Sequence, residues 1–115
     1  MRKPLTVDEL EERKRELEKI IKQLKAEDQK IREKYEKAKK LEDELYNKLM
    51  STRDDIERAR LELKYMKAKE YHSKFAQKLE EVEKKLRGAI AEYEEVSRMI
   101  EYLKPKGRFV EESNS

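Results

Sequence analysis

The sequence predicts an all-α protein, a long antiparallel coiled-coil hairpin of two helices that we expect to dimerise into a four-helix bundle. Half of its 115 residues are charged and only 36% are hydrophobic, with two Gly and two Pro; this composition is typical of long helices. Apolar residues recur at alternating gaps of four and three along two segments, the heptad spacing of helices that pack on a partner helix. The two segments differ in phase, which indicates a chain reversal between them.

The first helix is predicted over residues of about 7–50, and its start is well marked. Thr6 is a capping residue, and Glu9 three positions later completes a capping box. Leu5 and Leu10 have the spacing of the hydrophobic staple that accompanies such a start. We therefore expect the helix to begin at about Val7.

A heptad row, here called the first seam, runs along this helix. Three of its residues are polar, and polar residues at core positions can set the register of a coiled coil at some cost in stability. The first seam consists of Leu10, Lys14, Leu17, Ile21, Leu24, Asp28, Ile31, Tyr35, Ala38, Glu42, Leu45 and Leu49.

The second helix is predicted over about 56–104 and carries a longer row, the second seam. This row consists of Leu61, Tyr65, Ala68, His72, Phe75, Leu79, Val82, Leu86, Ala89, Tyr93, Val96, Ile100 and Leu103. Continuing the first seam would instead select positions 52, 56, 59, 63 and 66. One continuous helix would need a stutter to absorb this difference, whereas a reversal resets the phase.

A turn near 51–56 matches the ends of the two helices. Ser51–Asp54 or Thr52–Asp55 supply capping residues for the second helix. In an antiparallel pair, the position numbers of facing residues have a constant sum. With a sum of 110, Val7 faces Leu103 and the two seams face each other along their length. Registers shifted by one heptad leave the ends unmatched. The alternative fold is one continuous helix in a parallel coiled-coil dimer.

Outside the hairpin at 7–104, we expect a basic lead-in at 1–6 and a flexible tail at 105–115. Pro105 ends the second helix because proline disrupts the helical hydrogen bonding. Gly88 lies inside that helix, on the outer side of the second seam. It is either a tolerated flaw or a point where another backbone approaches closely.

The sequence favours a protein that is not an enzyme and that holds no metal or cofactor. It has no Cys, and its only His, at position 72, lies on the second seam with no further ligands at suitable spacing. There is no phosphate-binding loop and no nucleophile elbow. The net charge of +3 and the lack of a long apolar run give no membrane signal, so we expect a cytoplasmic protein. Its Lys and Glu content with no Cys also suits a thermophile.

The leading hypothesis is a structural or interaction protein that forms a homodimer and scaffolds or bridges a protein partner. The residues expected to hold the seams together are Leu10, Leu17, Ile21, Leu24, Ile31, Leu45, Phe75, Leu79, Val82, Leu86, Val96 and Ile100. Apolar residues beside the seams predict a second contact face for self-association or a partner. The candidates for this face are Ile20, Leu41, Leu63, Met66, Ile90 and Met99.

Two alternatives remain open. The half of the hairpin near the turn is rich in basic residues, which favours a nucleic-acid-binding accessory protein. Its candidate phosphate contacts are Arg60, Lys64, Lys67, Lys74 and Lys78. The other alternative is a holdase chaperone similar to prefoldin, in which long helical hairpins also occur. Prefoldin subunits carry β-hairpins as well, and this sequence predicts none.

Overall fold

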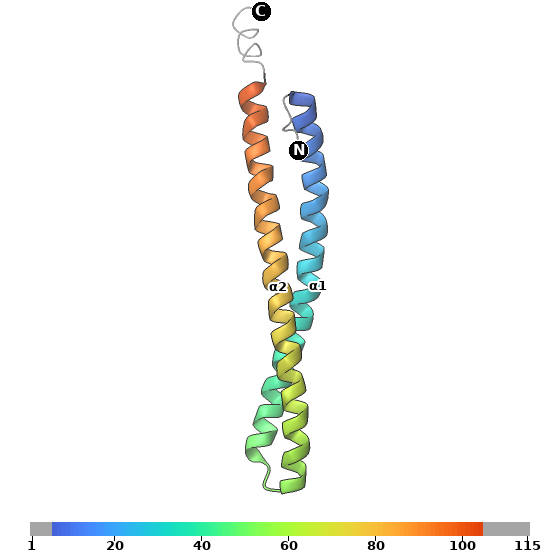
Figure 1. Ribbon diagram of the computed structural model, residues 1–115, viewed down its shortest axis with the longest axis vertical. Helices are drawn as coiled ribbons and strands as arrows, with labels where there is room; N and C mark the ends of the chain where they lie inside the picture. Colours follow the sequence, from blue (N-terminus) through green and yellow to red (C-terminus); the bar gives the residue numbers. More distant parts are fainter. Residues whose placement is uncertain (1–5, 105–115) are drawn as a thin grey trace, which may run out of the picture. The chain divides into compact units, whose positions relative to one another are not determined.

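The computed structural model describes residues 6–104, which form two α-helices (Figure 1). Helix α1 spans Val7–Ser51, helix α2 spans Asp55–Leu103, and residues 52–54 connect them. The predicted all-α helical hairpin is confirmed, with helix bounds close to the expected 7–50 and 56–104. The tail at 105–115 and the lead-in, apart from Thr6, lie outside the described residues, as does Leu5 of the expected staple.

Helix α1 begins with the predicted capping box. The Glu9 amide donates to Thr6 Oγ1 at 3.1 Å, and the Thr6 amide donates to Glu9 Oε1 at 3.2 Å. The pair thus satisfies two amide groups that the first turn leaves without helical partners. Asp8 and Glu9 also place negative charge in the first turn, where the helix dipole favours it.

The cap of α2 is the second residue of the expected Ser51–Asp54 pair rather than Ser51 or Thr52. The Ile56 amide donates to Asp54 Oδ1 at 3.0 Å, so Asp54 caps α2. Ser51 is still the last residue of α1, where its hydroxyl donates to the Asn47 carbonyl at 2.8 Å. Arg58 Nη2 donates to the Thr52 carbonyl at 3.0 Å and ties the connection to α2. The expected Ser51 and Thr52 caps are therefore wrong, because α2 begins at Asp55 and the residue before it is Asp54.

The described residues divide into two compact units, and each helix contributes one segment to each unit. The first unit contains residues 6–25 and 85–104. Its core is a cluster of Leu10, Leu17, Val96 and Ile100, with Val7, Ile20 and Tyr93 packed against it. Leu10 and Leu17 are each 1% exposed. This pairing of early α1 with late α2 is antiparallel, as the matched ends predicted.

The second unit contains residues 26–84, including the connection. Its core cluster consists of Leu45, Leu49, Leu61 and Ala68, with Tyr65 against it. Leu49 and Leu61 belong to the same cluster, as expected for facing positions that sum to 110.

Both seams lie at the contact between α1 and α2 in their own units. Every seam position is buried or half-buried except Leu103, which is 44% exposed at the end of α2. Among the residues expected to hold the seams together, the buried ones are Leu10, Leu17, Leu45, Leu79, Val82, Val96 and Ile100. The half-buried ones are Ile21, Leu24, Ile31, Phe75 and Leu86.

Candidate interaction surfaces

A bidentate ion pair flanks the core of the first unit. Arg13 Nε donates to Glu92 Oε2 at 2.8 Å, and Arg13 Nη2 donates to Glu92 Oε1 at 3.0 Å. These hydrogen bonds, helped by the attraction of opposite charges, lower the pKa of Glu92 and raise that of Arg13. Partial burial opposes both shifts. The pair fixes how the two helix segments of this unit face each other.

A second ion-pair group joins α1 and α2 in the other unit. Arg32 Nη2 pairs with Asp28 Oδ2 at 3.5 Å and donates to Glu83 on α2. The hydrogen bond to Glu83, with the attraction of Asp28, raises the pKa of Arg32. Asp28 Oδ1 is buried and has no hydrogen-bond partner within residues 6–104. Arg32 therefore links a polar seam residue of α1 to the opposite helix.

The second unit also contains a polar layer inside its seam. His72 Nδ1 lies 2.6 Å from Glu42 Oε2, and these side chains are 25% and 14% exposed. The Tyr35 ring tilts against His72 with centroids 4.9 Å apart. Ala38 and Ala68 are 9% and 2% exposed and belong to the same stretch of the seams. Small residues beside Glu42 and His72 leave room for the polar pair.

The polar residues of the first seam find partners within the hairpin. Glu42 pairs with His72 and Asp28 with Arg32. Lys14 Nζ lies 5.5 Å from the centroid of the Tyr93 ring, within the range of a cation–π contact.

The residues expected to form one partner face do not share one location. In the first unit, Ile20 packs against the core cluster. Ile90 lines a shallow surface hollow with Ile21 and Tyr93, whereas Met99 lines another with Tyr102 and Leu103. In the second unit, Leu41 lines a groove over the small seam residues. Leu63 and Met66 lie on α2 and are 66% and 58% exposed.

Leu63 and Met66 belong to a row on α2 that we call the outer stripe, made of Ile56, Ala59, Leu63 and Met66. These positions have gaps of three, four and three, so they share one face of the helix. At 100° per residue this face lies roughly 160° around α2 from the second seam. Ile56 is 67% exposed and Ala59 is also exposed. The outer stripe thus faces away from α1.

The candidate phosphate contacts Arg60, Lys64, Lys67, Lys74 and Lys78 are all exposed on α2. Lys67 and Lys74 line one surface hollow together with Tyr71 and Glu70. Lys78 Nζ instead lies 5.7 Å from the centroid of the Phe75 ring. Only part of the expected basic set is gathered at one place, and the acidic Glu70 lies there too.

An apolar groove lies over the small seam residues Ala38 and Ala68 in the second unit. Leu41, Tyr71 and Phe75 supply its apolar lining. Lys34 and Lys37 line it from α1.

Ile56 was not among the expected partner residues, although it is 67% exposed. The signal for Ile56 was present, because the continued phase of the first seam selects positions 56, 59, 63 and 66.

Residues 6–104 contain no group of three or more His, Cys, Asp or Glu that could hold a metal ion. Within the same range, neither helix has a segment apolar enough to cross a lipid bilayer.

Comparisons of the chain with protein-family models, curated proteins and solved structures find no match.

Proposed function

We propose that this chain is a non-enzymatic interaction protein of the cytoplasm, a coiled-coil hairpin that self-associates and bridges protein partners. The observation that carries the proposal is the outer stripe. The two seams already cover each other within the hairpin units, yet Ile56, Leu63 and Met66 remain between 58% and 67% exposed.

Isolated exposed apolar side chains are common on protein surfaces and need no partner. The outer stripe differs because its residues repeat at heptad spacing on one face of an ordered helix. That spacing is what a second helix requires for knobs-into-holes packing. A helix face of this kind recognises another amphipathic helix, which is the chemistry expected of an interaction protein.

Sedimentation equilibrium of the full chain across a wide concentration range tests the proposal. The wild type is expected to shift from one to two copies as concentration rises. Leu63→Asp places a charge in the middle of the outer stripe and should hold the protein at one copy. Lys64→Asp, one residue away on α2, is the control and should leave the association unchanged. A wild type that stays monomeric throughout, and equals Leu63→Asp, contradicts self-association.

A second candidate function is supported by the hollow lined by Lys67, Tyr71 and Lys74. Two ammonium groups beside an aromatic ring suit a phosphate backbone with a stacked base. Fluorescence anisotropy with a labelled single-stranded oligonucleotide measures this directly. Affinity should fall steeply with salt and be lost in Lys67→Glu/Lys74→Glu. Binding that persists in that variant excludes the hollow as the site.

A further inference from the structure

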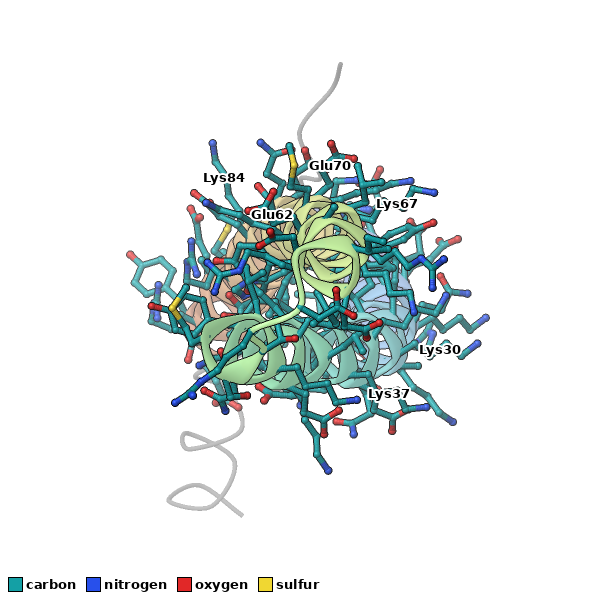
Figure 2. The ribbon with its side chains drawn as sticks, turned by 90° about the horizontal axis from the view of Figure 1, so that it is seen from below. Lys30, Lys37, Glu62, Lys67, Glu70 and Lys84 are labelled. Carbon is teal, nitrogen blue, oxygen red and sulfur yellow. The ribbon has the colours of Figure 1, made fainter. Side chains whose placement is uncertain are left out.

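The outer stripe of α2 has an acidic edge and a basic edge. Asp55 and Glu62 lie on one side of it, and Arg60 and Lys67 lie on the other, as 100° per residue requires. Figure 2 shows Glu62 and Lys67 extending from opposite sides of α2. The structure records no ion pair for any of these four side chains within residues 6–104, and all four are exposed.

We propose that two copies of this chain pair through their outer stripes with the two α2 helices parallel. The inference rests on the self-association proposed above and specifies its surface and direction. In a parallel pair each stripe residue meets its own counterpart. Ile56 packs on Ile56 of the second copy, and Leu63 and Met66 do likewise. The contact is then related by a two-fold axis that runs along the helices.

The charges at the edges support the parallel direction. In a parallel pair, the residue that precedes a core position lies beside the residue five positions further on in the other helix. Asp55 then meets Arg60 of the second copy, and Glu62 meets Lys67 of the second copy. The two-fold axis repeats both contacts. All four edge contacts of the parallel pair therefore join opposite charges.

The same charges oppose the antiparallel direction. The stripe itself would tolerate an antiparallel partner, with Ile56 opposite Met66 and Ala59 opposite Leu63. In that arrangement, however, each edge meets the identical edge of the other copy. Asp55 would lie beside Glu62, and Arg60 beside Lys67. All four contacts then join like charges, so the edges select one direction and reject the other.

The stripe also limits the extent of the contact. Position 70 continues its spacing beyond Met66, but that residue is Glu70, which projects from α2 in Figure 2. Two glutamates facing each other at a core position repel. The apolar contact is therefore confined to about the first three turns of α2. Because the contact is short, dimerisation is expected to depend on protein concentration. The charges at the edges of the stripe should make a measurable contribution to the dimer affinity.

Charge reversal tests the direction, using sedimentation equilibrium at low salt. Lys67→Glu turns two attractive contacts into repulsive ones and should weaken the dimer about tenfold. Lys64→Glu makes the same change in net charge away from the edge and is the matched control. The swap Glu62→Lys/Lys67→Glu restores attraction and should return affinity to near the wild-type value. In an antiparallel pair, Lys67→Glu would face Arg60 and tighten the dimer, which overturns the proposal.

A cysteine cross-link provides an independent readout, because the chain has no Cys. In the parallel pair, Met66→Cys places two thiols side by side, and mild oxidation should give a covalent dimer. In the antiparallel pair the same thiols lie about 15 Å apart along the axis and do not join. A wild type that dimerises while Met66→Cys fails to cross-link overturns the parallel contact alone. A wild type that never dimerises overturns self-association as well.

Discussion

The polar layer of the second unit offers a sharp test of how the seams hold their register. Glu42 and His72 form a close pair at positions that heptad packing reserves for apolar residues. We expect the pair to stabilise the native register rather than to add much net stability. A slip of one heptad that brings facing positions to a sum of 103 would place Glu42 opposite Leu61. Its carboxylate would then lose His72 and lie against an apolar side chain.

The size of the effect follows from the burial of the pair. The side chains are 14% and 25% exposed, between a surface ion pair and a fully buried one. Removing one partner leaves a partly buried polar group unsatisfied, which costs about 1–3 kcal/mol. Replacing both by leucine removes that cost and adds apolar contact beside Ala38 and Ala68. We therefore expect a coupling energy of about 1–2 kcal/mol between Glu42 and His72.

The assay is a double-mutant cycle of His72→Leu, Glu42→Leu and the double variant, measured by urea unfolding at pH 7. Each single variant should have a lower free energy of unfolding than the double variant. The double variant should equal or exceed the wild type in stability. Effects that add to within about 0.5 kcal/mol would refute the reasoning, because additivity means that the two side chains do not interact.

Three further outcomes are expected. Leu17→Ala removes a core side chain that is 1% exposed and should lower the free energy of unfolding by about 2–5 kcal/mol. Leu63→Ala, measured at concentrations where the protein is monomeric, should change that free energy by less than about 0.5 kcal/mol. Equal losses in the two variants would contradict the assigned core. Arg13 lowers the pKa of Glu92 in the folded state. The wild type should therefore be more stable than Glu92→Gln above about pH 4.3, the unfolded pKa of glutamate, and this difference should disappear as the pH falls through the lower folded pKa. A stability difference that grows towards acid pH contradicts this. An added Cβ at Gly88 would meet no atom within 4 Å. Gly88→Ala should therefore raise the free energy of unfolding by about 1 kcal/mol. A loss of dimer affinity in this variant would instead show that the backbone of a second chain approaches Gly88.

The sequence was sufficient for those features that depend on local chemistry or on periodicity. Thr6 and Glu9 mark the start of α1 because a capping box involves only four consecutive residues. The seams were predictable because a heptad row has to be covered by a partner helix, and their phase difference favoured a reversal over one continuous helix. The helix bounds followed from these two kinds of signal.

Other features depend on competition or on long-range register, which the sequence alone did not decide. Ser51, Thr52 and Asp54 are all capping residues, and the choice of Asp54 depends on where α1 ends. The ion pair of Arg13 with Glu92 joins residues 79 positions apart, so it becomes visible only once the helices are aligned.

The candidate surfaces were predicted in part for a similar reason. Apolar residues outside the seams were recognised, but their distribution over faces depends on how each helix is rotated in its unit. Ile20 packs against a core cluster, whereas Leu63 faces away from α1. Ile56 completes the outer stripe and would have been found by following the phase of the first seam past the turn.

The central claim is that the two seams cover each other within one chain and leave the outer face of α2 for a partner. Spin labels on Glu12→Cys/Arg98→Cys, two exposed positions of the first unit, test it by pulsed electron resonance. Paired helix segments place these Cα atoms about 15 Å apart, and dilution with unlabelled chain should not change the signal. A continuous helix would separate them by about 130 Å, so loss of the short distance would contradict the account.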